Sequence, residues 1–342
     1  MKKILAITLA LMLALSMLSA LADLDTTTDD ATVTIKKVYR TLNGGVSPAE
    51  TFSFSAFTEV SADNDTQTFP AGKPSITAIS YAEGDATPDG TGTGTKTATI
   101  TLPTYNSVGV YTYSFYEVTP ATKTAGVTYR EESNLIYLVV TVVQDSDNRL
   151  RVAAVHCEGG HDQGEYGTSP KTDSFENTYE AGQFVVGKDV TGLLGDRAKT
   201  FAITVTFAAK DGEQINSKIK YQGTADSSYY SASSDGTEMT GSSITLNLKH
   251  GDQVTFSNVP KGVTYTVSEA DYTADGYTSS ISSATGTTGA QAEPFTVIVT
   301  NHKQGEIDTG ISLDTLPYVV LLAVAALGAA LLIIRRRRRE ED

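Results

Sequence analysis

The stretch Thr32-Val-Thr-Ile-Lys-Lys-Val-Tyr39 alternates apolar with polar residues, which is the two-residue period of a strand with one buried face. Val33 and Ile35 lie on that face, and parity places Lys37 in the same row. Further segments of this kind follow, separated by clusters of Gly, Asn, Asp and Pro. No helical period occurs between the two ends of the chain. The sequence therefore predicts an all-β protein made of two tandem β-sandwiches.

The same arrangement of a lysine and a glutamate occurs twice. Phe184 and Val186 share a strand face with Lys188, as Val33 and Ile35 do with the first lysine. A glutamate then ends an apolar row in each half: Glu117 follows its lysine by 80 residues, and Glu269 follows its own by 81. This near-equal spacing indicates a repeat of one structural unit.

Each half also closes on a strand that carries an asparagine in its apolar row, Asn177 in the first half and Asn301 in the second. Each half thus directs a Lys, a Glu and an Asn toward its core. An unpaired ammonium or carboxylate costs several kcal/mol to bury, so such groups are normally paired, neutralised or exposed. One interpretation is that the residues lie at strand ends, where each lysine extends to water.

The other interpretation is covalent. In an apolar core the lysine shifts toward the neutral nucleophile and the glutamate toward the protonated acid. A protonated glutamate can polarise the asparagine carbonyl, and an amide forms between the two side chains with loss of ammonia. Cys157 is the one cysteine and cannot close an intramolecular disulfide, so such bonds would replace a cystine framework.

The N-terminus predicts export. Residues 1–22 contain two lysines, an apolar run over 4–18 and the small-residue site Ala20-Leu-Ala22, which together are typical of a secretory signal peptide cleaved after Ala22.

The C-terminus predicts a membrane anchor. Residues 304–316 form a polar stalk, and 317–334 are almost entirely apolar and close to the length that spans hydrocarbon. Five arginines open the segment 335–342, which the positive-inside rule leaves in the cytoplasm. The protein is expected at the cell surface, in the membrane or cell wall.

The composition argues against several function classes. Acidic residues outnumber basic ones by 40 to 26, a net charge of −14, which disfavours a nucleic-acid partner. No nucleophile elbow, phosphate-binding glycine loop or EF-hand spacing occurs, so we expect neither an enzyme nor a cofactor. His156, Cys157 and His161 lack a fourth ligand, and no metal site is expected.

The chain resembles the major, or backbone, pilins of Gram-positive bacteria. Residues 23–180 are similar to the pilin isopeptide-linkage domain, and residues 181–303 to the Cna B-type pilin domain that often follows it. The resemblance implies two immunoglobulin-like sandwiches. It is carried by Thr34-Ile-Lys-Lys37-Val-Tyr, Ser47-Pro-Ala-Glu-Thr-Phe52, Tyr113-Ser-Phe-Tyr-Glu117 and Phe175-Glu-Asn177-Thr-Tyr179, then by Val186-Gly-Lys188-Asp-Val-Thr-Gly192, Leu248-Lys-His-Gly251, Tyr265-Thr-Val-Ser-Glu269 and Val299-Thr-Asn301.

The hallmark of this family is an autocatalytic Lys–Asn isopeptide bond assisted by a glutamate. The resemblance therefore implies a bond between Lys37 and Asn177 with Glu117 as the catalytic group. It implies a second bond between Lys188 and Asn301 with Glu269. Lys36 competes with Lys37 in the first domain. Strand parity favours Lys37, but a β-bulge would reverse the choice.

Family pilins are joined by a sortase, which cuts between Thr and Gly of a short motif before the membrane helix. Thr309 and Gly310 occupy that place, although no proline precedes the threonine. Lys171 resembles the family lysine that accepts the threonine of the next subunit. The resemblance thus implies a sortase and other pilin subunits as partners, in a fimbrium or attached to the wall.

The sequence leaves two other function classes open. A monomeric membrane- or wall-anchored adhesin would contact a host ligand through surface loops, such as the insert Ser61–Lys96 or Tyr229-Tyr230. A surface hydrolase would show turnover that depends on Glu117, but no ordered catalytic triad supports it.

Overall fold

The structure is a computed structural model that describes residues 32–62, 68–161, 171–224, 227–229, 236–289, 294–305 and 316–340. The predicted signal peptide, Thr309 and Gly310 lie outside the described residues.

The first sandwich is built mainly from β-branched and aromatic strands, as the alternating pattern predicted. Its strands are β1 (Thr32–Leu42), β2 (Glu50–Phe54), β3 (Thr58–Ala62), β4 (Ser75–Ile76), β5 (Ile79–Tyr81), β6 (Thr95–Thr101), β7 (Gly109–Phe115), β8 (Glu117–Val118), β9 (Lys123–Thr124), β10 (Val127–Thr128), β11 (Leu135–Gln144), β12 (Leu150–His161) and the first half of β13 (Ser174–Thr191), with a short 3₁₀ helix η2 (Gly92–Gly94). Strand β1 pairs with β13 in parallel and with β6 antiparallel, while a second sheet has the order β12-β11-β7-β3.

The second sandwich begins in the same strand β13. Its other elements are β14 (Phe201–Ala208), β15 (Glu213–Gln214), β16 (Lys220–Gly223), β17 (Thr237–Glu238), β18 (Ser243–Leu248), β19 (Gln253–Pro260), β20 (Thr264–Glu269), η3 (Thr273–Asp275), β21 (Thr278–Ile281), β22 (Thr285–Thr287) and β23 (Phe295–His302). Strand β13 pairs antiparallel with β19 and in parallel with β23, and the opposing sheet has the order β18-β14-β20-β22. The all-β prediction is confirmed.

Each sandwich has its own core. Aromatic residues dominate the first, where Tyr39, Tyr111 and Tyr113 have no exposed surface. In the second, Ile203 and Val205 alternate with half-buried residues along β14, so every other side chain enters the core. Burial of these rows from both sheets supplies most of the free energy that holds each sandwich together.

The segment predicted as a surface loop, Ser61–Lys96, contributes to the first core instead. Within its described part it forms β4, β5 and the start of β6. Tyr81 is buried there, and its hydroxyl donates a hydrogen bond of 2.5 Å to the backbone carbonyl of Lys37. The Gly, Thr and Asp content that suggested a loop reflects the tight turns between these short strands.

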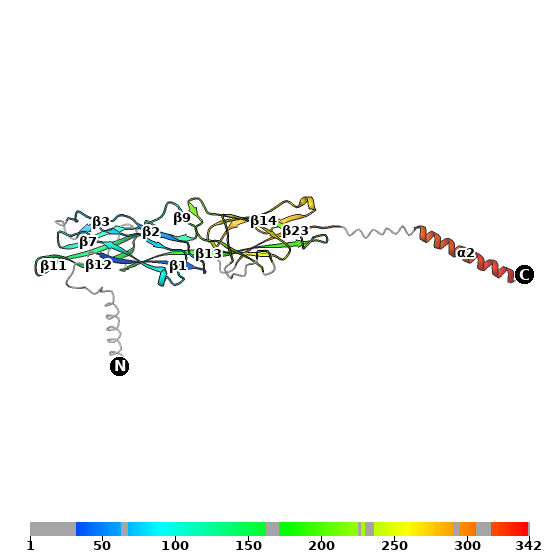
Figure 1. Cartoon of the computed structure of the whole chain (residues 1–342), viewed down its shortest axis with the longest axis horizontal. Coiled ribbons are helices and arrows are strands. Elements are labelled where there is room, and N and C mark those ends of the chain that lie inside the picture. The colour runs from blue at the N-terminus through cyan, green and yellow to red at the C-terminus, as the bar shows by residue number, and fades with distance from the viewer. Residues whose placement is uncertain are drawn as a thin grey trace, which may run out of the picture.

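The two sandwiches lie end to end and share β13, as Figure 1 shows. Asn258, which has a left-handed φ of 57°, fills the junction between them. Its Oδ1 accepts hydrogen bonds from the Val46 amide at 3.0 Å and the Tyr179 hydroxyl at 3.3 Å, and its Nδ2 donates to the Lys218 carbonyl at 3.2 Å. Strands β9 and β15 also pair across the junction. These contacts fix one domain against the other.

One helix, α2 (Leu316–Glu340), follows the sandwiches in the described part of the chain. Residues 318–337 are long and apolar enough to cross a membrane, and their side chains are not buried against the protein. This helix coincides with the span predicted over 317–334.

Replacing Asn258 by Ala should destabilise the domain junction. The change removes three hydrogen bonds and places a Cβ-bearing residue without a polar side chain at a left-handed φ. We expect the free energy of unfolding to fall by about 1–3 kcal/mol, measured by chemical denaturation of residues 23–305. Asn247→Ala, at an exposed strand position, is the matched control. Equal effects of the two variants would contradict the role of Asn258.

Candidate functional site

The first predicted triplet meets inside the first sandwich. Lys37 lies on β1, Glu117 begins β8, and Asn177 lies on β13. Their exposed fractions are 0%, 1% and 2%, so this lysine does not extend to water. The register aligns Tyr39 with Asn177, which places the asparagine two residues along from its lysine on the neighbouring strand.

These three side chains form a closed hydrogen-bonded cluster. The Lys37 ammonium donates to Glu117 Oε2 at 2.5 Å and also to Asn177 Oδ1. The Asn177 amide donates to Glu117 Oε1 at 2.5 Å. The carboxyl group therefore contacts both the amine and the nitrogen that would leave as ammonia. The Phe52 ring lies 4.6 Å from Lys37 Nζ and closes the site on another side.

The surroundings favour the neutral amine. Burial lowers the pKa of Lys37 below its ordinary value, while the adjacent Glu117 carboxylate acts in the opposite direction. The charge of Arg130 lowers the Lys37 pKa further. An amine that loses its proton more easily is the stronger nucleophile at neutral pH.

The second triplet meets in the same way. Lys188 lies on β13, Glu269 ends β20, and Asn301 lies on β23. The register aligns Val190 with Asn301, so the two-residue offset of the first cluster recurs. Lys188 Nζ donates to Asn301 Oδ1 at 2.5 Å, and the Phe201 ring lies 4.4 Å away. Burial again lowers the pKa of the lysine.

The two clusters differ in how the glutamate is bonded. Glu269 Oε1 lies 3.6 Å from Lys188 Nζ, and the amine donates instead to the carbonyls of Asp189 and Val299, at 2.9 and 3.1 Å. Both carboxyl oxygens of Glu269 and the Asn301 amide nitrogen are buried without a hydrogen-bond partner among the described residues. The first cluster is thus the better organised of the two.

The remaining predicted residues lie at the surface or outside the described residues. Lys36 points away from the cluster and forms an exposed ion pair with Asp173 at 3.0 Å. Of the two competing lysines, the structure places Lys37 in the cluster. Lys171 is exposed beside β12, where it forms an isolated bridge with Glu158.

Of the residues considered for a metal, His156 and Cys157 lie on β12, and the side chain of His161 lies outside the described part of the structure. Among the described residues, no group of three or more His, Cys, Asp or Glu side chains is arranged to hold an ion. Cys157 is buried, and burial raises its pKa to about 12, so its thiol stays protonated and unreactive. The His156 ring contacts the Glu158 carboxyl at 3.2 Å.

Sequence reasoning missed the groups that surround the clusters. Arg130 stacks over the Phe175 ring at 5.3 Å and donates to Asn134 Oδ1 at 2.9 Å, and its charge acts on Lys37. Phe52 and Phe201 each cover a lysine but follow it by different numbers of residues, so spacing alone would not identify them.

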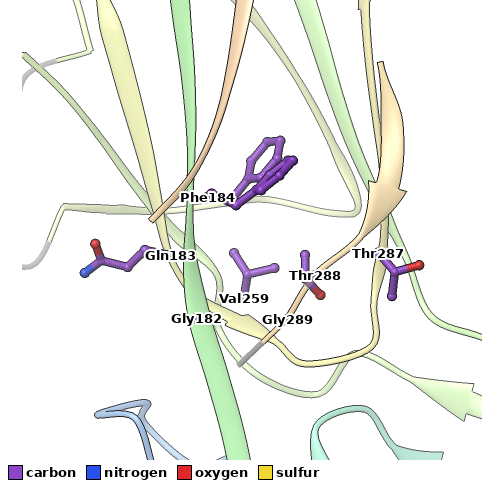
Figure 2. A pocket seen from close by; sticks show the side chains of 8 residues that line it. Gly182, Gln183, Phe184, Val259, Thr287, Thr288 and Gly289 are labelled. Atoms are coloured by element: carbon purple, nitrogen blue, oxygen red, sulfur yellow. The ribbon is translucent and has the colours of Figure 1, made fainter. Parts of the chain in front are cut away.

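A pocket in the second sandwich lies apart from both clusters, between β13, β19, β22 and β23. Figure 2 shows Phe184, Val259 and Thr288 around it, with the Gln183 amide pointing away from the Phe184 ring. Phe184 stacks on Phe295 at 6.1 Å. The lining includes no charged side chain, so it lacks the acid–base groups of the clusters.

Two family models match the chain and divide it at the domain junction. Residues 33–180 match the Spy0128-like isopeptide containing domain. Residues 182–303 match a domain of unknown function, DUF7601. The second match leaves the Cna B-type assignment of residues 181–303 a prediction.

The chain is similar to a curated pilin and to solved pilin structures. A pilin of Streptococcus pyogenes serotype M1 is 25% identical over 328 residues, which covers 89% of this chain and 91% of that protein. The crystal structure of the major pilin from Streptococcus pyogenes is 22% identical with a TM-score of 0.56, covering 81% of this chain and all of that one. The major pilin T3.2 from the same species is 20% identical, with a TM-score of 0.53, over 81% and 99% of the two chains.

The structural likenesses show the fold, and one family model matches the first domain. Both agree with the resemblance to pilins seen in the sequence. The chain is thus similar to the Gram-positive major pilins, and its residues 33–180 match a Spy0128-like isopeptide containing domain.

Proposed function

We propose that this protein is the backbone subunit of a surface pilus, hardened by one autocatalytic isopeptide bond in each domain. The bonds join Lys37 to Asn177 and Lys188 to Asn301. The observation that carries the proposal is the closed, buried contact of Lys37, Glu117 and Asn177. It has the nucleophile, the electrophile and a proton carrier in direct contact.

The reaction balances without any co-reactant. Glu117 takes a proton from the Lys37 ammonium, and the neutral Nζ attacks the Asn177 side-chain carbonyl carbon. The protonated Glu117 gives that proton to the Asn177 amide nitrogen, which it contacts, and then takes the second proton from the attacking Nζ, so that Glu117 ends protonated. The C–N bond to the amide nitrogen breaks, the C–Nζ bond forms, and ammonia leaves. The second site would use Glu269 in the same role, after its carboxyl group turns toward Asn301.

Each bond would close a large loop of the chain. The partners are 140 residues apart in the first domain and 113 in the second. By analogy with the chain-entropy account of disulfides, closure of such loops stabilises the fold by about 4–5 kcal/mol each. The bonds would also relieve the cost of burying two lysines, because an amide carries no charge.

Export and anchoring complete the proposal. The signal peptide leads to secretion, and α2 with its arginines holds the chain in the membrane until a sortase acts. The sortase would cleave between Thr309 and Gly310 and transfer the threonine carbonyl to the amine of Lys171 in the next subunit. The exposed position of Lys171 supports that role.

The intact mass of residues 23–305 should be lower than the sequence mass by two ammonia molecules. Glu117→Ala and Glu269→Ala should each lose one of the two deficits, because each removes the proton carrier of one bond. Glu176→Ala, an exposed carboxylate next to Asn177, should keep both. A parent protein at its full sequence mass would refute the two cross-links.

The competing lysines can be separated by substitution. Lys37→Ala should remove one ammonia deficit and lower the free energy of unfolding by about 4–5 kcal/mol, as expected for loss of the loop closure. Lys36→Ala should change neither mass deficit, since its side chain is exposed and bonded to Asp173. Mass spectrometry and denaturant titration of both variants test this. Loss of a deficit in Lys36→Ala alone would reverse the assignment.

Wall extracts of the producing bacterium should show a ladder of polymers on denaturing gels. Lys171→Ala and Thr309→Ala should each abolish the ladder, because one removes the acceptor amine and the other the cleavage site. Lys210→Ala, another exposed lysine, should leave it unchanged. A single anchored band from the parent chain would support the adhesin instead.

A further inference from the structure

The loop between β13 and β14 exposes two adjacent leucines. Leu193 and Leu194 have exposed fractions of 64% and 50%. Within the described parts of the two sandwiches, these are the most exposed large apolar side chains, and they are consecutive. Leaving two such side chains in water forgoes the free energy that burial of each would supply.

The loop is held firmly in this exposed position. The Leu194 amide donates to the Lys303 carbonyl at 3.1 Å, and the Asp196 amide donates to the Tyr277 hydroxyl at 3.0 Å. Gly192 has a φ of +90°, and a Cβ there would lie 2.2 Å from the Lys303 carbonyl oxygen. Only glycine permits this approach. The two leucines are thus presented by a fixed turn rather than by a chain free to fold them inward.

The leucines lie where the chain leaves the second sandwich. Leu194 packs on the backbone of Gly305, where an added Cβ would lie 2.0 Å from Leu194 Cδ1. Thr309, the proposed sortase site, follows Gly305 by four residues. Four residues of fully extended chain span at most about 14 Å.

We propose that Leu193 and Leu194 are the contact surface for a second copy of this chain, and bury against its surface around Lys171. This inference rests on the proposed function. Once Thr309 is joined to Lys171 of the next subunit, the two surfaces are held close to each other by the four residues that follow Gly305 and by the Lys171 side chain. The covalent link gives each surface a high effective concentration near the other, so that even a small apolar contact between them stays formed. Before the bond forms, the same contact would bring Lys171 toward the sortase-bound threonine.

Substitution of the more exposed leucine tests the contact in the full chain, expressed in the producing bacterium. Leu193→Ser should reduce the polymer ladder about tenfold, the effect expected from loss of one buried leucine at an interface. Val108→Ser, which changes a side chain of 45% exposure on the first sandwich, is the control. Both variants should keep the two-ammonia deficit, which shows that the fold is intact. An unchanged ladder in Leu193→Ser would overturn the inference.

A photo-crosslinking amino acid at position 193 identifies what covers the loop. We expect a product with a second copy, in peptides from β12 or from the segment next to Lys171. A product with lipid, or none at all, would contradict the proposed partner. A different result would show that the pilin proposal itself is wrong. In that case the ladder would survive Lys171→Ala and Thr309→Ala, whatever the result at position 193.

Discussion

Strand β13 determines where both buried clusters lie. Its first half pairs in parallel with β1 and its second half in parallel with β23, so one strand carries Asn177 of the first cluster and Lys188 of the second. In both pairings the asparagine lies two residues along from its lysine. A shift of one residue in either register would move one partner to the opposite face of the sheet. The chemistry proposed for both domains therefore depends on backbone hydrogen bonding along a single strand.

The two clusters share this geometry but differ in how completely their polar atoms are hydrogen-bonded. Around Lys37 every polar atom of the triplet has a partner, and Arg130 adds a positive charge that disfavours the ammonium form. Around Lys188 the amine donates partly to backbone carbonyls, and the Glu269 carboxyl group is buried without a hydrogen bond among the described residues. A buried carboxyl group without a hydrogen bond lowers the stability of the fold. Formation of a neutral amide would remove the charge of the neighbouring Lys188 ammonium.

Much of this arrangement follows from local pattern. Alternation placed Lys37 and Lys188 in apolar rows, and the repeat of Glu and Asn at matching distances indicated two units of one kind. The tertiary surroundings were beyond such reasoning. Arg130 acts through space from a loop, and Asn258 accepts a hydrogen bond from Val46, 212 positions away, at the junction. Tyr81 entered the core from a stretch whose composition indicated surface loops. Periodicity reports which face a residue occupies, but not which distant segment packs there.

The position of Lys171 just before β13 has a mechanical consequence once the proposed bonds are in place. Tension that enters a subunit at Lys171 runs along β13 to Lys188, crosses to Asn301 and leaves through the stalk. The chain between the last two residues, a separation of 113 positions, is bypassed. The first sandwich, apart from its share of β13, carries no load at all. Pulling would therefore stretch only short, already extended segments, and the fibre would keep its length while its domains stay folded.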